Sequence, residues 1–358
     1  MVRGRRCGRR NRRGSLVLLC LALVGLLWGC ERVDRRAPSR AFYYWRTTFE
    51  LTPTERRALV DLRVDKLYLR AFDVAPGSRD TPTFVGVVRP APQQALPPGV
   101  ALVPVVFLKN QVFAAAEPGS ERVLAGRVWS EVTKVGKALG AHELGELQVD
   151  CDWTDSTQAR YFEFVRALRK VSAPGTRLSA TIRLHQVKYR ERTGVPPVDS
   201  GMLMFYNMGR FSADPLERSI FDVDAAERYL ARLDDYPLPL DAALPIWSWT
   251  LQLRDQEVVG LLQSTDPAEL PALDFVKPER LGFEVTRTTF LHGSLLRQGD
   301  VLKAESLNAS DIAKAAGLLA NNLAPASERR TVALFDLSER NLSRHGLRTL
   351  EQAFQVVR

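Results

Sequence analysis

The sequence has few cysteines and histidines and none of the glycine-rich motifs that bind nucleotide cofactors. It contains 4 Cys and 4 His in 358 residues, and no His-x-x-x-His spacing, so a zinc site of the common kinds is not predicted. Neither Gly-x-Gly-x-x-Gly nor Gly-x-x-x-x-Gly-Lys-Ser/Thr occurs, so dinucleotide and P-loop sites lack their main support. We therefore expect neither a bound metal nor a cofactor.

The body of the chain also lacks a surplus of charge of one sign. The formal net charge is +9, but residues 1–13 hold seven arginines and no acid. Without residues 1–29 the chain has 43 basic and 41 acidic residues. A nearly neutral body gives no support for binding a polyanion, so we predict no nucleic-acid partner.

The first thirty residues have the pattern of a targeting segment. The basic start is followed by thirteen apolar residues, Leu16–Trp28, which would rise about 20 Å as a helix, against a hydrocarbon core of ~30 Å. That length is typical of a secretory signal. Leu27-Trp28-Gly29-Cys30 resembles a bacterial lipobox. The resemblance implies that residues 1–29 are a lipoprotein signal peptide and that Cys30 is lipidated.

Lipidation of Cys30 would anchor the protein to a bacterial membrane outside the cytoplasm. A plain signal peptide and an uncleaved anchor are the alternatives, and both also place the body outside the cytoplasm. Residues 30–40 are polar and indicate a tether or linker. Cys151 would be the one free thiol, so no intramolecular disulfide is expected and a single domain over 41–358 must depend on its core.

Two kinds of segment alternate along the body. Helical periodicity is found from residue 53 and over 121–139, 156–171, 224–233 and 308–323. Short apolar segments predict strands at Ala41–Trp45, Leu67–Val74, Ala101–Leu108, Glu146–Trp153, Arg177–Leu184, Met202–Met208, Asp241–Trp249 and Thr331–Ser338. Strands that alternate with helices indicate a parallel sheet, and eight of them favour an α/β fold of the (β/α)8, or TIM-barrel, type.

The connection between the seventh and eighth strands is much longer than one helix requires. It spans roughly eighty residues, whereas most connections of this kind are far shorter. A hairpin is expected over 249–262, with further strands at Leu281–Phe290 and Asp300–Ala304. We interpret 250–306 as a β-rich excursion from the barrel rim.

The strongest candidate for chemistry is a pair of aspartates at the end of the fourth strand. Asp150 and Asp152 share one face of the strand with Gln148, about 6.5 Å apart along the chain. Two close carboxylates in a partly dry site cannot both ionise freely, so one acts as an acid beside the other. A helix cap or a buried salt bridge is the structural alternative. Cys151 is expected to face the helices as a small buried apolar group.

Polar side chains at the ends of other strands should reach the same level. These are Arg70 and Asp73 on strand two, Arg183 and His185 on strand five, and Asp336 on strand eight. Because barrel enzymes act at the carboxyl ends of their strands, we expect these groups to contact a substrate. For each one alone, a structural ion pair is an equally good explanation.

Aromatic and amide side chains end strands six and seven. Tyr206, Asn207, Trp247 and Trp249 have the chemistry of a saccharide site, because flat apolar rings stack on sugar CH groups while polar groups bind hydroxyls. The alternative is core packing, which uses tryptophan and tyrosine readily.

Two motifs resemble family 18 glycoside hydrolases, the chitinase-like barrels. That family ends strand four with Asp-x-Asp-x-Glu, where Gln148-Val149-Asp150-Cys151-Asp152 stands here, and Met204-Phe205-Tyr206-Asn207 matches its Met-x-Tyr-Asp/Asn. The resemblance implies a retaining glycosidase in which Asp152 is the general acid and Asp150 its partner. It also implies that Tyr206 and Asn207 direct the acetamido group of the substrate.

A wider resemblance is to uncharacterised bacterial lipoproteins. It rests on Tyr43–Arg46, Leu69–Val74, Asp150–Thr154 and Leu244–Trp249. It implies the barrel and the tether, and no particular activity.

Two functions follow as hypotheses. The first is a membrane-tethered, glycoside-hydrolase-like protein acting on a cell-envelope or environmental glycan. The second is a non-catalytic barrel that binds a glycan or a protein, because Gln148 replaces an aspartate and Asp152 is one methylene shorter than glutamate.

Overall fold

The computed structural model describes residues 1, 37–77, 81–114, 117, 119–214, 216–326 and 328–357. The predicted signal peptide, Cys30 and most of the linker lie outside the described residues. Within them, no helix has the length and apolar character needed to span a bilayer.

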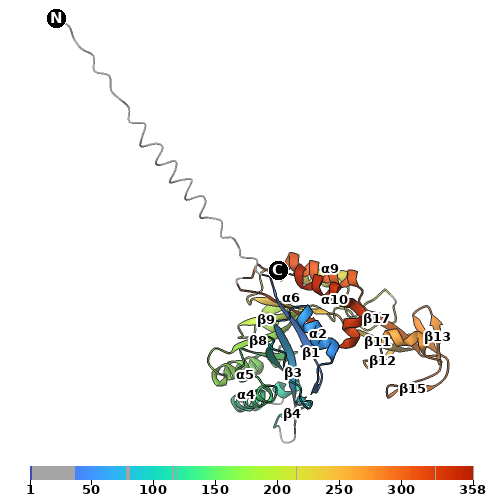
Figure 1. Cartoon of the computed structure of the whole chain (residues 1–358), viewed down its shortest axis with the longest axis horizontal. Helices are drawn as coiled ribbons and strands as arrows, with labels where there is room; N and C mark the ends of the chain where they lie inside the picture. The colour runs from blue at the N-terminus through green and yellow to red at the C-terminus, as the bar shows by residue number, and fades with distance from the viewer. Residues whose placement is uncertain are drawn as a thin grey trace. The chain divides into compact units, whose positions relative to one another are not determined.

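Eight parallel strands form a closed barrel (Figure 1). Both β3 and β18 pair with β1, and this double pairing closes the ring. The predicted α/β fold of the TIM-barrel type is therefore confirmed. The barrel strands are β1 (Ser39–Tyr44), β3 (Lys66–Ala75), β6 (Ala101–Leu108), β7 (Glu146–Cys151), β8 (Arg177–Arg183), β9 (Ser200–Met204), β10 (Leu240–Pro245) and β18 (Thr331–Phe335).

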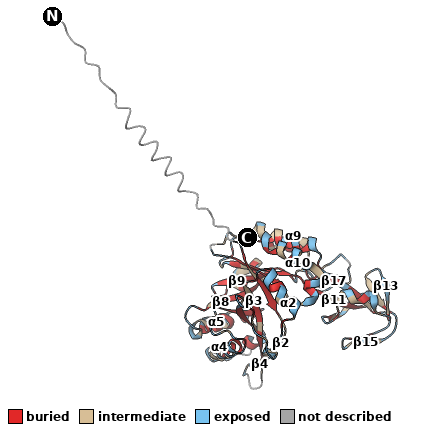
Figure 2. Cartoon of the chain, in the orientation of Figure 1, coloured by how far each residue is buried: buried red, intermediate tan, exposed pale blue. Residues whose placement is uncertain are grey.

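Helices cover the outside of the barrel, with their outer faces exposed (Figure 2). Thr52 caps α2: its Oγ1 accepts a hydrogen bond from the Glu55 amide, and the Thr52 amide donates to the Glu55 carboxylate, as expected where Pro53 begins the first turn. The five predicted helices are present, and α3, α6, α7 and α10 were not predicted. The helices are α2 (Pro53–Asp61), α3 (Gln111–Ala114), α4 (Ser120–Ala138), α5 (Gln158–Val171), α6 (Leu184–Lys188), α7 (Arg190–Thr193), α8 (Val223–Leu230), α9 (Ala309–Asn322) and α10 (Glu339–Val356).

The barrel has two apolar layers. The larger layer lies between strands and helices and includes Leu178, Ala180, Ile182 and Cys151, so the thiol is a buried core group as expected. The smaller layer fills the lumen with side chains that include Tyr43. This alternation is what a parallel strand with helices outside requires.

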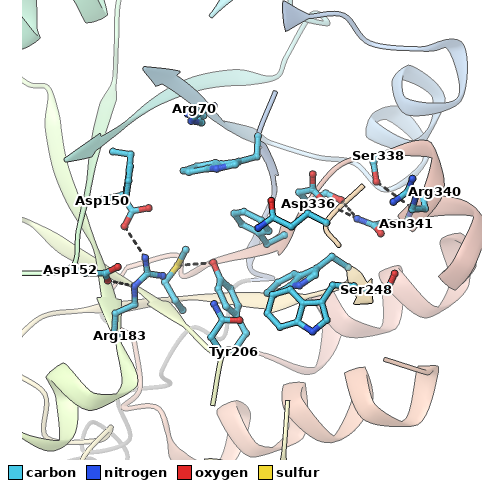
Figure 3. Close-up of a pocket in the computed structure, with 18 of the residues that line it drawn as sticks. Arg70, Asp150, Asp152, Arg183, Tyr206, Ser248, Asp336, Ser338, Arg340 and Asn341 are labelled. Carbon is cyan, nitrogen blue, oxygen red and sulfur yellow. Dashed lines mark hydrogen bonds and ion pairs between the residues drawn. The ribbon is translucent and has the colours of Figure 1, made fainter. Parts of the chain in front are cut away.

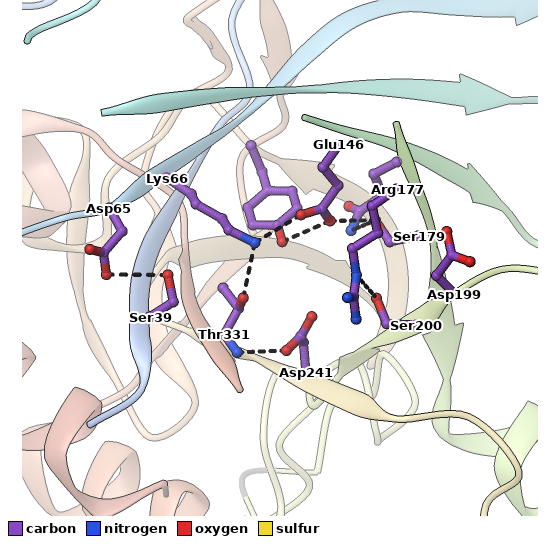
Figure 4. A network of polar contacts seen from close by, with 12 residues as sticks. Ser39, Asp65, Lys66, Glu146, Arg177, Ser179, Asp199, Ser200, Asp241 and Thr331 are labelled. Carbon is purple, nitrogen blue, oxygen red and sulfur yellow. Dashed lines mark hydrogen bonds and ion pairs between the residues drawn. The ribbon is translucent and has the colours of Figure 1, made fainter. Parts of the chain in front are cut away.

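A polar network occupies the lower lumen, towards the amino ends of the strands (Figure 4). Glu146 receives hydrogen bonds from Lys66 Nζ at 2.8 Å, Tyr68 Oη at 3.1 Å and Ser179 Oγ at 2.7 Å. One level higher, the Tyr43 hydroxyl donates to Gln148 Oε1 at 2.7 Å. These bonds satisfy the buried polar groups and close the barrel below the site.

The connection between β10 and β18 forms the expected β-rich excursion. Its main sheet has the order β12-β11-β17-β14-β13, beside a β15–β16 hairpin, and it has its own apolar core around Leu270 and Leu302. The predicted strand Leu281–Phe290 is two strands. The excursion contains β11 (Ser248–Arg254), β12 (Glu257–Leu262), η2 (Pro267–Ala272), β13 (Val276–Glu279), β14 (Gly282–Val285), β15 (Thr289–Leu291), β16 (Ser294–Leu296) and β17 (Val301–Ser306). Short strands elsewhere are β2 (Thr48–Phe49), β4 (Thr83–Val85) and β5 (Arg89–Pro90).

Four barrel strands end two to four residues earlier than predicted. They end at Cys151, Met204, Pro245 and Phe335. The apolar pattern continues past the last paired residue because the loops that follow also pack at the barrel mouth. The candidate residues after these strands therefore lie in loops, except Trp249, which lies in β11.

Candidate functional site

A cavity of about 920 Å³ opens at the carboxyl ends of the barrel strands (Figure 3). This is the end at which barrel enzymes place their active sites. Ten of the eleven residues predicted to form the site line it: Arg70, Asp73, Asp150, Asp152, Arg183, Tyr206, Asn207, Trp247, Trp249 and Asp336.

Asp150 points into the lumen from β7 and is 3% exposed. Thr181 Oγ1 donates to its Oδ1 at 2.6 Å, and Arg183 Nη2 contacts the same oxygen at 3.1 Å. Burial raises the pKa of Asp150, and the arginine and the threonine oppose that rise. The carboxyl is therefore firmly oriented.

Asp152 lies just beyond the end of β7, at the cavity mouth. Its side chain is 56% exposed, and its Oδ1 accepts a hydrogen bond from Arg183 Nε at 2.6 Å. Arg183 thus contacts both aspartates through different nitrogens (Figure 3). The predicted pair is brought together, with a cation shared between its members.

Arg70 and Asp73 form a second ion pair in the same cavity. Arg70 Nε and Nη2 donate to the two Asp73 oxygens at 2.8 and 2.6 Å, the two-point geometry that orients a guanidinium well. The Arg70 guanidinium carbon lies 5.9 Å from the centroid of the Trp45 ring. Both residues thus line the cavity and also form the structural ion pair that was the alternative.

Aromatic rings form one wall of the cavity. The rings of Tyr206 and Trp247 meet edge to face, with their centroids 4.6 Å apart. The centroid of the Trp247 ring lies 5.3 Å from that of Phe335 and 6.0 Å from that of Trp249. Burial raises the pKa of Tyr206, so its hydroxyl stays protonated. Trp45 and Phe335 also line the cavity, although neither was predicted as a site residue. Trp45 could have been predicted from the sequence, because it directly follows the first strand and so lies at the carboxyl end of the barrel.

Asp336 follows β18 and lines the cavity as well. Asn341 Nδ2 donates to its Oδ1 at 2.7 Å and to its backbone oxygen at 2.9 Å. Burial raises the pKa of Asp336, and Arg46 opposes that rise. Ser338, Arg340 and Asn341 line the same region. They were not predicted as site residues, because no helix was expected after Ser338.

His185 lies elsewhere. The prediction that placed His185 on the same face as Arg183 assumed a continuing strand. The strand β8 ends at Arg183, and His185 belongs to α6, which begins at Leu184. His185 lines a neighbouring cavity of about 280 Å³, which shares Asp152 and Tyr206 with the larger one. Burial lowers the pKa of His185, so the imidazole is neutral near pH 7.

Asn207 turns the chain at the cavity rim. Its φ is 55°, in the left-handed region that asparagine tolerates better than most residues. Among the described residues, no group of three or more His, Cys, Asp or Glu side chains is arranged to hold a metal ion.

Several solved structures share this fold. The spore cortex-lytic enzyme SleL of Bacillus cereus aligns with a TM-score of 0.54 at 10% identity, over 90% of this chain and 75% of its own. A chitinase from Bacteroides thetaiotaomicron aligns with a TM-score of 0.52 at 13% identity, over 89% of this chain and 97% of its own. For a class V chitinase from Nicotiana tobaccum the TM-score is 0.50, at 11% identity over 88% and 99% of the two chains.

The fold is that of chitinase-like barrels. The distant similarity to family 18 glycoside hydrolases, predicted from two motifs, is thus confirmed at the level of the fold. No protein-family model and no curated protein sequence matches the chain.

Proposed function

We propose that the protein is an extracytoplasmic glycoside hydrolase that acts on a cell-envelope or environmental glycan in the large cavity. The observation that carries this proposal is the shared cavity itself, in which the aspartates at the end of β7 face an aromatic wall. Carboxyl groups beside a bound sugar supply the proton transfers of glycoside hydrolysis. The family resemblance gives Asp152 the role of general acid, with Asp150 as its partner.

The cavity suits a saccharide in both size and chemistry. Trp45, Trp247 and Trp249 offer flat apolar faces, and Asn207 and Arg70 add polar groups. A site of this kind combines apolar walls with a few placed polar groups. A mutant of the tobacco chitinase was solved in complex with NAG4, so N-acetylglucosamine oligosaccharides are suitable first probes.

Asp152→Asn tests the catalytic assignment. We expect it to reduce turnover of chitin oligosaccharides, peptidoglycan fragments or aryl glycosides by a factor of about 10² to 10⁴, the usual contribution of general acid–base catalysis. Asp155→Asn is the matched control, because Asp155 lies on the same loop, 54% exposed, and pairs with Arg192. Unchanged turnover by Asp152→Asn would show that Asp152 is not a catalytic group.

A second candidate function is glycan binding without hydrolysis. It is favoured by the contacts of Arg183, which pairs with Asp150 and Asp152 together and so occupies the carboxylate oxygens that a catalytic pair would turn towards a substrate. This function predicts that a saccharide binds and that no product is formed. Binding can be measured by the change in tryptophan fluorescence. Trp247→Ala should weaken that binding at least about tenfold, since the ring lies at the centre of the aromatic wall.

We also propose that the protein is held on a bacterial membrane through a lipid on Cys30. In support of this arrangement, the described chain enters the barrel at the amino end of β1, where the Ser39 amide donates to the Arg330 carbonyl. The cavity opens at the carboxyl ends of the same strands. A tether at the amino ends would leave the cavity free to meet a glycan.

A further inference from the structure

A third carboxyl group faces the two aspartates from the opposite side of the barrel. Asp336 follows β18, whereas Asp150 and Asp152 stand at the end of β7. In the closed ring, three strands separate β18 from β7 in each direction. Figure 3 shows Asp336 across the cavity from Asp150 and Asp152. A sugar bound between the two walls would therefore have a carboxyl group on each side.

The ionic partners of these carboxyl groups differ. Four aspartates line the cavity, and three of them have arginine partners: Arg70 for Asp73, and Arg183 for Asp150 and Asp152. Within the described part of the chain, no Lys, Arg or His nitrogen lies within 4.0 Å of an Asp336 carboxylate oxygen.

The groups around Asp336 leave it able to hold a proton. Its side-chain partner from α10 is the neutral Asn341 amide, at 2.7 Å. The ionised groups that act on it are Arg46 and Glu55, and these form an ion pair with each other at 2.9 Å. Burial is the largest influence and raises the pKa of Asp336.

Glycoside hydrolysis by two carboxyl groups needs one protonated acid and one carboxylate. Asp152 is held in an ion pair with Arg183 at 2.6 Å, the environment of a carboxylate. Asp336 is half-buried and has no cationic partner within 4.0 Å among the described residues, and burial raises its pKa by more than the hydrogen bond from Asn341 lowers it, which is the environment of an acid.

We infer that Asp336 is the proton donor of the proposed hydrolysis and that Asp152 is the carboxylate that accepts a proton from the attacking water. The Asp336 carboxyl proton goes to the glycosidic oxygen as its bond to the anomeric carbon breaks. Water adds its oxygen to that carbon and gives one proton to Asp152. Solvent then takes the proton from Asp152 and returns one to Asp336. The inference rests on the proposed function. It differs from the family resemblance in the identity of the acid and in the stereochemistry, because direct attack by water inverts the anomeric carbon whereas the resemblance implies retention.

Substrates with different leaving groups test this inference. A sugar alcohol needs a proton in order to leave, whereas dinitrophenol leaves as a stable anion and does not. We expect Asp336→Asn to lose about 10² to 10⁴-fold in kcat/KM on a chitin oligosaccharide, and less than about tenfold on the dinitrophenyl glycoside of the same sugar. Asp152→Asn should lose activity on both substrates, because both require attack by water.

Asn341→Ala is the second variant. It leaves the Asp336 carboxyl group in place and removes the amide that orients it. We expect Asn341→Ala to lose less kcat/KM than Asp336→Asn, with the same dependence on the leaving group. The inference can therefore be tested even if Asp336→Asn does not fold. Circular dichroism and thermal melting confirm that each variant is folded.

Each outcome has a distinct meaning. Equal losses by Asp336→Asn on the two substrates, or no loss at all, would overturn the assignment of Asp336. So would leaving-group dependence that appears in Asp152→Asn instead, and that result would establish the acid implied by the family resemblance. A wild-type protein that hydrolyses neither these substrates nor peptidoglycan fragments would overturn the proposed hydrolysis itself, and the inference with it.

Discussion

Arg183 shows how far residue-level reasoning from the sequence extends. The period-two pattern of β8 placed its side chain in the lumen near the aspartates, and the structure has it there, in contact with both. Sequence spacing alone could not distinguish a substrate ligand from an ion-pair partner. That choice depends on distances between strands, because Asp150 and Arg183 belong to neighbouring strands whose register only the folded barrel sets.

Removal of Arg183 should destabilise the protein. Arg183→Gln leaves the Asp150 carboxylate, whose side chain is 5% exposed, without its cation, at a cost of about 3 kcal/mol in the free energy of unfolding. The double variant Asp150→Asn, Arg183→Gln should lose less than the single variant, since no charge is then buried alone. Urea denaturation measures both. Equal stability of Arg183→Gln and the wild type would mean that the ion pair contributes nothing.

Elements were easier to predict than their ends. Alternating apolar segments located all eight barrel strands, because burial on both faces leaves a clear pattern. The same pattern ran too far in β7, β9, β10 and β18, where loop residues such as Tyr206 and Trp247 are buried by the cavity wall and not by strand pairing. Helix α10 was missed although Ser338 caps it, because Gly346, with φ 69°, interrupts the helix and divides its periodic pattern into two short pieces.

The network at the amino ends of the strands predicts a pH effect on stability. Burial raises the pKa of Asp241 on β10 to about 6, above the ordinary value of about 3.9 for an unfolded chain. The stability that the protonated Asp241 contributes is fully present below pH 4 and is lost as the pH rises through 6. Between these values the folded state holds a proton that the unfolded chain has already released. The Thr331 amide donates a hydrogen bond to Asp241 Oδ1 at 2.5 Å. The charges of Glu146, Lys66 and Arg177 also influence the pKa of Asp241.

Asp241→Asn keeps an oxygen for the Thr331 amide and removes the titration. Relative to this variant, the wild type should lose about 2 kcal/mol of unfolding free energy between pH 4 and pH 7. Thermal or urea denaturation of both proteins across this range measures the difference. A difference that stays constant with pH would contradict the raised pKa.

A lysine in the excursion should determine the order of the loop after β9. Lys303 on β17 is 5% exposed, and its Nζ donates to the carbonyls of Ser212, Asp214 and Glu217 at 2.9, 2.7 and 2.9 Å. Lys303→Met removes these bonds, and also the ion pair with Glu305 at 3.3 Å, while keeping an apolar chain of similar length. We expect faster amide hydrogen exchange over residues 209–219 and unchanged exchange in the barrel strands. Unchanged exchange in the loop would show that Lys303 does not hold it.

At the scale of the whole molecule, the prediction that remains open concerns the membrane. Replacement of Cys30 by serine should abolish incorporation of labelled palmitate in a bacterial host and move the protein from the detergent phase to the aqueous phase. Wild-type protein expressed in parallel is the control, and Cys7→Ser, a change within the predicted signal peptide, should behave like it. Equal partitioning of Cys30→Ser and wild type would argue for a plain signal peptide or an uncleaved anchor.

The sequence by itself determined the class of the fold, because alternating strands and helices that are apolar towards one core allow few arrangements. It also determined which polar and aromatic residues end the strands. Only the tertiary structure decided how those residues are paired. Closure of the barrel brings β7 next to β8 and opposite β18, which gives Asp150 and Asp152 a shared arginine and leaves Asp336 beside a neutral amide. The charge state of a carboxyl group depends on such neighbours across the barrel, and spacing along the chain does not specify them.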